Sequence, residues 1–329
     1  MGGKHKARHW RRDGEAIVCT LCPHFCRLAE GQVGICRGRR HADGELWALN
    51  YGRAPSLSLD PVEKKPLFHF HPGAAILSLG PVGCNFQCDF CQNWTVSQKD
   101  CPTSSFDPNS LVDYARRSGA IGISYTYTEP LIWFEFVFDC SVAFREAGLK
   151  TAMVSNGFVN PEPLGELLPL IDAWNIDLKS IRPDFYRRIS KGRLEPVLAT
   201  IERANEATLV ELTNLIVTGE NDSDEDLRDL VGWVAGIDRS IPLHFSRYHP
   251  DYRSSRPPTP QSTLERAYEI GREQLDYVYV GNIFIRGTET TWCPGCGAAV
   301  VERAGFGLSR AALEGNRCAA CGRELNIIT

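Results

Sequence analysis

Two kinds of hydrophobic pattern alternate along most of the chain. Short continuous apolar runs are typical of buried strands, and segments with apolar residues every three or four positions are typical of amphipathic helices. The runs that predict strands are residues 75–79, 121–127, 149–154, 173–178, 209–217, 241–245 and 277–280. The segments that predict helices are residues 108–118, 131–147, 162–168, 194–205, 223–235 and 262–272. Buried strands separated by amphipathic helices indicate an α/β fold built on a parallel sheet.

The 329 residues divide by composition into four parts. Residues 75–286 hold the alternating strands and helices, and this length suits one barrel-sized domain. Residues 14–74 and 287–329 each carry four cysteines but few apolar residues, so we expect each to need a bound metal to hold its fold. Residues 1–13 form a basic segment that we expect to be flexible.

Three cysteines follow the first predicted strand in the run GPVGCNFQCDFCQNW. Their spacing, C-x3-C-x2-C, offers thiolates at Cys84, Cys88 and Cys91. Three thiolates can bind three iron atoms of a [4Fe-4S] cluster and leave the fourth iron open for a substrate or cofactor. The alternative is a zinc ion or a closed cluster whose fourth ligand is Cys101.

This cysteine run and the motifs SYTYTEP, SNGF, NIDLK, LHFSRYHPDY and CPGC…CAAC together resemble one family of proteins. The cysteine spacing resembles that of the radical S-adenosylmethionine (SAM) superfamily. The whole set resembles the radical SAM enzyme of the AmmeMemoRadiSam system, a relative of the pyruvate formate-lyase activating enzymes. The resemblance implies a partial (β/α)6 radical SAM barrel. It also implies that SAM binds the open iron and is cleaved to a 5′-deoxyadenosyl radical, which abstracts hydrogen from a substrate that the motifs do not identify.

The resemblance further implies a set of SAM-binding residues at the carboxyl ends of the strands. These residues are Thr128, Glu129, Ser155, Asn156, Asp177, Lys179 and His249. By resemblance, Glu129 meets the amino group of SAM, and Lys179 meets its carboxylate with Asp177 nearby. Ser155 and Asn156 would meet the ribose. Structural alternatives remain open, since Glu129 also suits the first turn of a helix and Asp177 can pair with Lys179 to close the barrel mouth.

The chain departs from the family pattern at several positions around this pocket. Tyr127 and Thr128 stand where the superfamily usually has two glycines. Val154 replaces an aspartate of the activating enzymes, and Thr213 replaces an arginine. His249 aligns with a histidine near the methionine moiety, although a single histidine is as often a structural residue. We therefore expect some SAM contacts to differ from those of the relatives.

Eight further cysteines form two groups of four. The C-terminal group consists of Cys293, Cys296, Cys318 and Cys321. Its two C-x2-C pairs predict a zinc ribbon, with a rubredoxin-like iron site as the alternative. The N-terminal group consists of Cys19, Cys22, Cys26 and Cys36. Both a zinc ion and a second iron–sulfur cluster remain open for this group.

The composition limits the remaining possibilities. Eleven of the thirteen cysteines fall in the three metal-spaced groups, which indicates a reducing cytoplasm and not a disulfide scaffold. No apolar run approaches the length of a membrane span, and the first residues lack the hydrophobic core of a signal peptide, so we expect a cytoplasmic protein without a membrane partner. The net charge is −4, although residues 1–40 carry nine Lys or Arg against three acids. Such a basic segment can bind nucleic acid, but a solvated surface is the favoured interpretation.

Two other groups of polar residues have compositions that could support chemistry. Residues 221–229 are acidic, but Ser223 as a helix N-cap followed by first-turn acids accounts for them. Four residues before the first strand are candidates for contact with the substrate: Lys64, Lys65, His69 and His71. Cys140, in an apolar helical segment, is expected to be buried as a small hydrophobe.

The sequence therefore favours a radical SAM enzyme that also binds zinc. An activase of a glycyl-radical enzyme is an alternative within that class, and a zinc-ribbon scaffold for nucleic acid or a partner protein is the alternative from another class. For the leading hypothesis, the expected partners are an electron donor such as a flavodoxin or ferredoxin, and the Memo-type protein and other partner of the same system.

Overall fold

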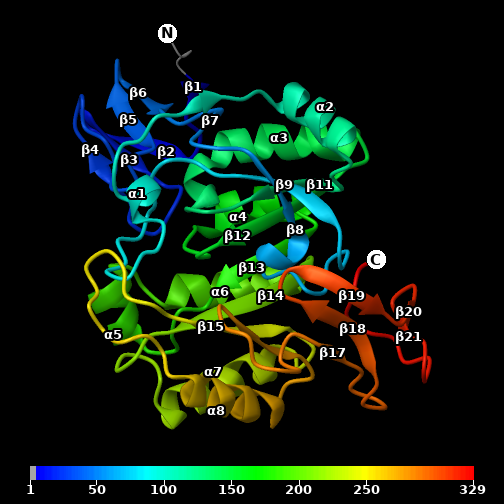
Figure 1. Ribbon diagram of the computed structural model, residues 1–329. Coiled ribbons are helices and arrows are strands. Elements are labelled where there is room, and N and C mark those ends of the chain that lie inside the picture. Colours follow the sequence, from blue (N-terminus) through cyan, green and yellow to red (C-terminus); the bar gives the residue numbers. More distant parts are fainter. Residues whose placement is uncertain (1–4) are drawn as a thin grey trace.

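The computed structural model describes residues 5–329, and one eight-stranded sheet lies at its centre (Figure 1). The strand order is β16-β15-β14-β13-β12-β11-β9-β8. The strands are β8 (Ser58–Pro61), β9 (Ala75–Leu79), β11 (Gly122–Tyr125), β12 (Lys150–Ser155), β13 (Ala173–Asp177), β14 (Leu209–Ile216), β15 (Leu243–Arg247) and β16 (Val278–Gly281). Neighbouring strands from β9 to β16 are parallel, and β8 pairs antiparallel with β9. The sheet is open, with β8 and β16 as its edges.

Helices connect the parallel strands in the alternation that the hydrophobic pattern predicts. The longer helices are α2 (Pro108–Ser118), α3 (Phe134–Glu146), α4 (Pro161–Leu167), α6 (Glu195–Asn205), α7 (Asp224–Ile237) and α8 (Gln261–Arg272). The short ones are η1 (Val62–Lys64), α1 (Trp94–Ser97), η2 (Pro130–Trp133), η3 (Leu168–Leu170), α5 (Pro183–Phe185) and η4 (Tyr186–Ser190). In Figure 1 the strands lie between α2 and α3 at the top and α7 and α8 at the bottom.

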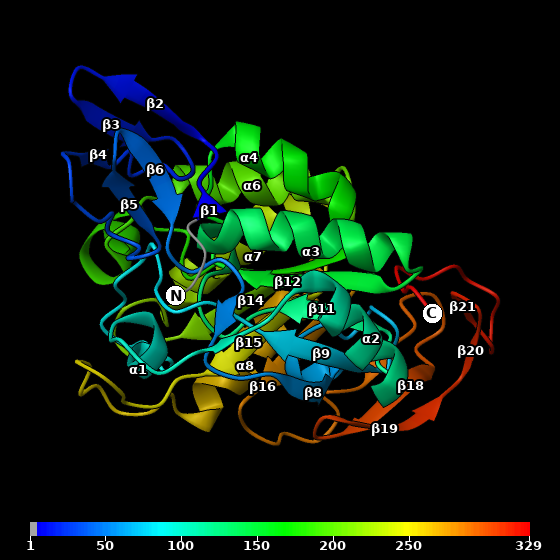
Figure 2. The ribbon, with the colours of Figure 1, turned by 90° about the horizontal axis from the view of Figure 1, so that it is seen from above.

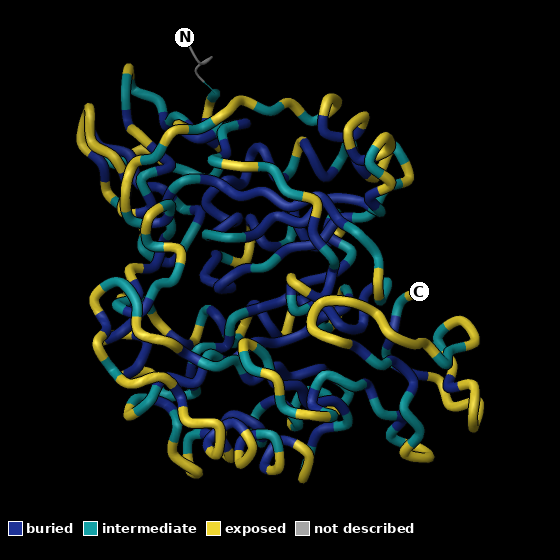
Figure 3. Tube along the Cα trace, viewed as in Figure 1, coloured by how far each residue is buried: buried dark blue, intermediate teal, exposed yellow. Residues whose placement is uncertain are grey.

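The predicted boundaries of these elements agree with the observed ones to within two residues at nearly every end. The exception is the predicted helix 131–147, whose first turn is the separate 3-10 helix η2. The strands bury nearly every side chain, as their continuous apolar runs require, and the helices bury one face. Figure 3 shows the same division, with buried segments at the centre and exposed ones around them.

Small antiparallel sheets form the N-terminal part of the chain. Their strands are β1 (His5–Lys6), β2 (Trp10–Asp13), β3 (Ala16–Cys19), β4 (Arg27–Leu28), β5 (Arg39–Ala42), β6 (Glu45–Ala48) and β7 (Arg53–Ala54), the last paired with β10 (Ser104–Ser105). Residues 5–13 differ from the flexible segment that was expected, because β1 pairs with β6, β2 pairs with β3, and Trp10 packs on the hydrophobic core. Residues 1–4 of that segment lie outside the described residues.

The C-terminal part, residues 287–329, forms a second small module. Its strands are β17 (Thr291–Trp292), β18 (Ala299–Ala304), β19 (Gly307–Ala311), β20 (Leu313–Glu314) and β21 (Arg317–Cys318). Figures 1 and 2 place this module and the N-terminal strands on opposite sides of the central sheet. The C-terminal module contacts the chain just before β9, where Ile328 N donates to the carbonyl oxygen of His69 at 2.8 Å. It therefore lies toward the amino ends of the parallel strands.

Candidate active site

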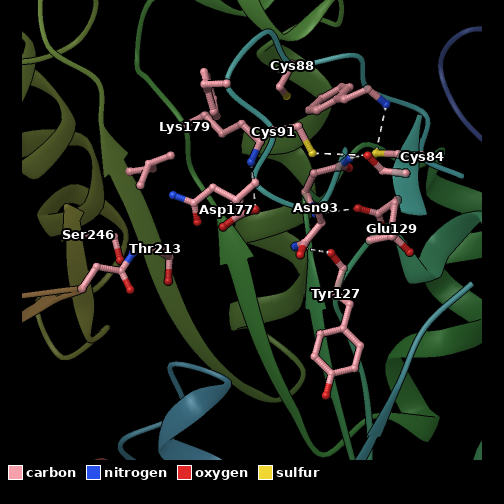
Figure 4. A pocket seen from close by; sticks show the side chains of 18 residues that line it. Cys84, Cys88, Cys91, Asn93, Tyr127, Glu129, Asp177, Lys179, Thr213 and Ser246 are labelled. Carbon is pink, nitrogen blue, oxygen red and sulfur yellow. Dashed lines mark hydrogen bonds and ion pairs between the residues drawn. The ribbon is translucent and has the colours of Figure 1, made fainter. Parts of the chain in front are cut away.

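The loop after β9 carries the three closely spaced cysteines. Cys84, Cys88 and Cys91 all line one pocket, with an empty volume of about 850 Å³, at the carboxyl ends of the strands (Figure 4). The loop turns sharply at Gly83, whose φ is +104°, and a Cβ there would lie 2.2 Å from the carbonyl oxygen of Cys36. The backbone N–H of Phe86 donates to the sulfur of Cys84 at 3.3 Å. The loop thus directs three thiols into one space.

Among residues 5–329, no cysteine besides these three lines the pocket. Cys101, the alternative fourth ligand of a closed site, does not line it. Burial raises the pKa of the Cys88 thiol to about 11, with the charge of Lys179 acting against that rise. A metal or cluster would bind the deprotonated thiolates and so reverse this preference for the thiol form.

Glu129 lies in the same pocket and organises two strand ends. It is fully buried and follows β11 as the N-cap of η2, where its carboxylate accepts from Leu131 N at 3.0 Å. It also accepts from the hydroxyl of Ser155 and from the backbone N–H of Asn156, each at 2.8 Å. Burial raises the pKa of Glu129 to about 7, although these three hydrogen bonds favour the anion. Glu129 therefore has the predicted role at the start of a helix, and it also binds the turn at the end of β12.

Of the two residues predicted to meet ribose, Asn156 lines the pocket and Ser155 does not. Ser155 instead donates its hydroxyl to Glu129 and accepts from the backbone N–H of Gly157 at 3.0 Å. The side-chain amide of Asn156 donates to Asn85 Oδ1 at 2.8 Å, which ties this turn to the cysteine loop. Gly157 has a φ of +69°, so the turn favours a glycine there.

Asp177 is the last residue of β13 and Lys179 lies two residues beyond it, and both line the pocket (Figure 4). Lys179 Nζ lies 2.8 Å from Asp177 Oδ2. Burial alone would lower the pKa of Lys179, but the negative charges of Asp177 and the Cys88 thiolate raise it above its ordinary value. Lys179 therefore both pairs with Asp177 and lies in the pocket as predicted, because its side chain faces the aspartate and the cysteines.

The remaining predicted residues lie at the edge of the pocket. Thr128 lines it and donates its hydroxyl to the carbonyl oxygen of Pro81 at 2.7 Å. His249 is exposed and does not line the pocket, but its Nδ1 lies 3.1 Å from the side-chain amide of Gln92, which does. Thr213, which stands where relatives have an arginine, lines the pocket and donates to Asn175 Oδ1 at 2.9 Å.

The structure adds lining residues that the sequence analysis did not single out. These are Gln92, Asn93, Leu215, Ser246 and Asn282, together with Ser97 of the short helix α1. Phe86 and Phe90, which the sequence places beside the cysteines, line the pocket as well. Ser246 lies near the end of β15 and Asn282 directly follows β16. Ser246 and Asn282 could have been found from the sequence, because each is a polar residue at the carboxyl end of a predicted parallel strand.

None of the four substrate-contact candidates before β9 lines the pocket. Lys64 and Lys65 both bind the carboxylate of Asp60, at 3.0 and 2.7 Å. His69 is buried on the side of the C-terminal module, and the backbone N–H of His71 donates to the carbonyl oxygen of Ile328 at 2.6 Å. The side chains of Lys64, Lys65 and His69 thus have partners away from the cysteine loop. The buried Nε2 of His71 has no hydrogen-bond partner among residues 5–329.

The C-terminal quartet (Cys293, Cys296, Cys318 and Cys321) brings all four sulfur atoms within 4.8 Å of one another. Two of its sulfur–sulfur distances are 3.6 Å (Cys293 to Cys321) and 3.8 Å (Cys296 to Cys318). Four thiolates about 2.3 Å from one zinc ion at tetrahedral angles would lie about 3.8 Å apart. This quartet could therefore hold a single metal ion.

The N-terminal quartet (Cys19, Cys22, Cys26 and Cys36) lines a separate cavity with an empty volume of about 360 Å³. Its sulfur atoms are more widely spaced. Within residues 5–329, the C-terminal quartet is the one group in which three or more potential metal ligands lie within 4.8 Å of one another. Cys140 is fully buried in α3, as expected. No helix of the described chain is both long and apolar enough to cross a membrane.

Comparison with known proteins assigns a family to this arrangement. The sequence model of the Radical SAM superfamily matches residues 80–234. The uncharacterized protein MJ0808 of Methanocaldococcus jannaschii is 44% identical over 325 residues, which cover 96% of this chain and 97% of the relative. The pyruvate formate-lyase-activating enzyme of Clostridium pasteurianum is 28% identical over 178 residues, covering 51% of this chain and 72% of that enzyme.

One solved structure shows the same fold over most of the chain. It is a radical SAM methyltransferase from Sphaerobacter thermophilus, with a TM-score of 0.52 and 15% sequence identity. The match covers 89% of this chain and 80% of that protein. At this identity the likeness concerns the fold alone.

Proposed function

Because the chain belongs to the radical SAM superfamily and is related to the pyruvate formate-lyase activating enzymes, we propose that it is a radical SAM enzyme whose substrate is still to be identified. The observation that carries this proposal is the set of three cysteines in one pocket with Glu129 and Lys179. When bound there, a [4Fe-4S] cluster and SAM supply a one-electron cleavage that forms a 5′-deoxyadenosyl radical, which takes a hydrogen atom from the substrate.

The pocket offers a charged group for each end of the methionine part of SAM. Lys179 is a largely buried cation, 12% exposed, whose present partner, Asp177, is one-third exposed, so the ammonium can also bind the carboxylate of SAM. Glu129 holds the strand-end turn against which the amino group would lie. Asn156 faces the pocket and is the residue we assign to the ribose, whereas Ser155 acts by holding Glu129 in place.

The opposite wall of the pocket is uncharged and polar, and we assign it to the substrate. Thr213, Ser246 and Asn282 lie there, at or just past the ends of β14, β15 and β16. His249 and Gln92 form a hydrogen-bonded pair at the rim. We further propose that the open sheet curves as the partial barrel typical of the superfamily.

Three further proposals concern the wider setting of this enzyme. The C-terminal quartet would hold zinc, since its spacing suits one tetrahedral ion. An electron donor of the flavodoxin or ferredoxin type would reduce the cluster. The motif set supports membership of the AmmeMemoRadiSam system, with its Memo-type protein as a partner. A second candidate function, activation of a glycyl-radical enzyme, is favoured by the similarity to the activating enzyme of Clostridium pasteurianum.

The test is anaerobic reconstitution of the full chain with iron and sulfide, followed by SAM and dithionite. We expect 5′-deoxyadenosine from the unaltered protein and none from Cys88→Ala, which removes one of the three iron ligands in the pocket. Cys101→Ser is the matched control, because this partly buried cysteine lies outside the pocket and should leave the product unchanged.

Product from Cys88→Ala at the level of the control would contradict the proposal. Loss of product from Cys101→Ser together with loss of cluster iron would instead indicate a closed four-cysteine site, which leaves no iron free for SAM.

A further inference from the structure

The N-terminal quartet encloses a small apolar cavity. Its four cysteines come from the end of β3 and the two loops that follow, and all four thiols are free. Cys19 and Cys36 are buried, and Cys22 and Cys26 are partly exposed. The other lining side chains are mostly aliphatic: Leu21, Leu28, Ile35 and Ile132. Four convergent thiols in an apolar enclosure form a metal or cluster site and not a substrate pocket.

The spacing of the sulfur atoms distinguishes this quartet from the C-terminal one. Four thiolates on one ion crowd together, as the 3.6 and 3.8 Å distances of the C-terminal quartet show. We call Cys84, Cys88 and Cys91 the Cys84 group. In residues 5–329, neither the N-terminal quartet nor the Cys84 group brings three sulfur atoms within 4.8 Å of one another. A four-iron cluster needs such wider spacing, because each cysteine binds a different iron and the inorganic core lies between them.

A buried cation faces the same cavity. Arg39 lines it and is 1% exposed, and its Nη2 donates to Glu135 Oε1 at 2.6 Å. Its Nη1 donates to the carbonyl oxygen of Arg8 at 2.6 Å. Its Nε is buried and has no hydrogen-bond partner within residues 5–329. A buried N–H of a cation without a partner indicates an anionic acceptor, such as the thiolates and sulfides of a cluster.

The cavity and the pocket of the Cys84 group share a thin wall. The ring Nε2 of His24, a lining residue of the cavity, lies 2.7 Å from the carbonyl oxygen of Asn85, the residue after Cys84. The carbonyl of Cys36 packs against Gly83, the residue before Cys84. Ile132 lines the cavity and would lie 3.2 Å from a Cβ on Gly83. The two cysteine groups are therefore neighbours in space.

We propose that the N-terminal quartet holds a second [4Fe-4S] cluster, which passes single electrons from a protein donor to the cluster at Cys84, Cys88 and Cys91. All four of its irons have a cysteine, so it cannot bind SAM and is limited to electron transfer. A one-electron flavin or iron–sulfur protein is oxidised as this cluster is reduced. The cluster is reoxidised when the electron moves to its neighbour, and no atom is transferred. The relay step rests on the proposed radical SAM function, whereas the presence of the cluster does not.

The first test measures metal content in a variant that leaves the quartet intact. The triple variant Cys84→Ala/Cys88→Ala/Cys91→Ala is reconstituted anaerobically and analysed for iron, sulfide and zinc, with Mössbauer spectroscopy and circular dichroism. We expect about four irons per chain in the triple variant, against about eight in the unaltered protein. Adding Cys22→Ala and Cys26→Ala should remove the remaining iron. A folded triple variant that contains zinc and no iron, or a two-iron spectrum, overturns the proposal.

The second test examines the relay. Formation of 5′-deoxyadenosine is compared in the unaltered protein and Cys22→Ser, with reduced flavodoxin and with dithionite, which can reduce the exposed pocket directly. We expect the flavodoxin-driven rate of Cys22→Ser to fall by about tenfold or more and the dithionite-driven rate to fall much less. An equal fall with both reductants, or no fall with either, overturns the relay. Iron in the triple variant without 5′-deoxyadenosine from the unaltered protein would instead contradict the radical SAM function alone.

Discussion

Glu129 shows how one side chain can hold several parts of the pocket at once. Its two carboxylate oxygens receive hydrogen bonds from the first turn of η2, from Ser155 at the end of β12 and from Asn156 directly after it. A carboxylate with three donors is well placed as an anion, yet complete burial raises the pKa to about 7. The negative charge of nearby Asp177 also raises the pKa of Glu129, in the same direction as burial. Its charge therefore changes near neutral pH.

This pKa predicts a pH-dependent contribution to stability. Because the native carboxyl group binds its proton more tightly than the unfolded one, the contribution is complete below pH 4.5 and is lost as the pH rises through about 7. The loss amounts to something on the order of 3 kcal/mol of unfolding free energy. We expect anaerobic urea titrations to show this fall for the unaltered protein relative to Glu129→Gln, which cannot ionise.

The glutamine substitution also has a cost in stability that does not depend on pH, because its amide N–H groups face backbone donors that the carboxylate accepts. The prediction is therefore tested by how much more the unfolding free energy of the unaltered protein falls between pH 5 and pH 8 than that of Glu129→Gln. Parallel profiles for the two proteins would mean that Glu129 does not titrate in this range.

Tyr127 illustrates a departure from the family pattern that the backbone explains. Its φ is +70°, a left-handed conformation that glycine adopts freely and that costs a tyrosine on the order of 1–3 kcal/mol. Two contacts offset this cost. The tyrosine hydroxyl donates to Asp60 Oδ2 at 2.8 Å, and the backbone carbonyl accepts from the side-chain amide of Asn93 at 2.6 Å. This left-handed turn is thus formed with a side chain that joins β8 to the pocket.

At the scale of elements, the repeating pattern of strand and helix was predictable from the sequence, whereas the approach of distant segments was not. The family resemblance of their motifs predicted a place in the pocket for Lys179 and Asn156. Both line it just past the ends of buried strands, where parallel strands present their carboxyl ends together. The short strand β8 was missed, since four residues with one buried side chain have no distinctive period. The packing of the Cys36 carbonyl against Gly83 joins positions far apart in sequence, and no local pattern encodes it.

The start of α7 gives an element-scale prediction. Ser223 caps this helix by accepting from the backbone N–H of Asp226 at 3.1 Å, and Asp224 and Glu225 follow in the first turn. Replacement by alanine leaves that N–H without its acceptor. We expect Ser223→Ala to lower the unfolding free energy by about 1 kcal/mol without changing the cluster iron. Ser262→Ala in α8 is the control, since this exposed serine follows a proline N-cap that makes no side-chain cap bond. An equal effect of both variants would contradict the cap.

At the scale of the whole molecule, the two ends of the parallel strands carry different cysteine groups. The cysteine loop and the N-terminal quartet lie at the carboxyl ends of the strands, and the C-terminal module lies at the amino ends. A buried polar network fastens that module in place. Arg303 of β18 donates to the carbonyl oxygen of Phe68 at 2.6 Å and to Thr291 Oγ1 at 2.9 Å, and Thr291 is linked through the Tyr279 hydroxyl to His69. The module is joined to the sheet by these contacts, independently of any ion in its own quartet.

This separation predicts that the two ends lose metal independently. Cys296 and Cys321 are exposed, so a chelator can reach an ion in the C-terminal quartet, and Cys296→Ala/Cys321→Ala removes two of its four ligands. We expect amide hydrogen exchange in residues 293–298 and 313–325, which carry the quartet, to become about tenfold faster or more. Residues 83–97, the cluster iron and the yield of 5′-deoxyadenosine should match those of Cys101→Ser, because the network through Arg303 and His69 still holds β18 against the sheet. Loss of cluster iron in step with loss of the C-terminal ion would show that the module supports the pocket across the whole sheet.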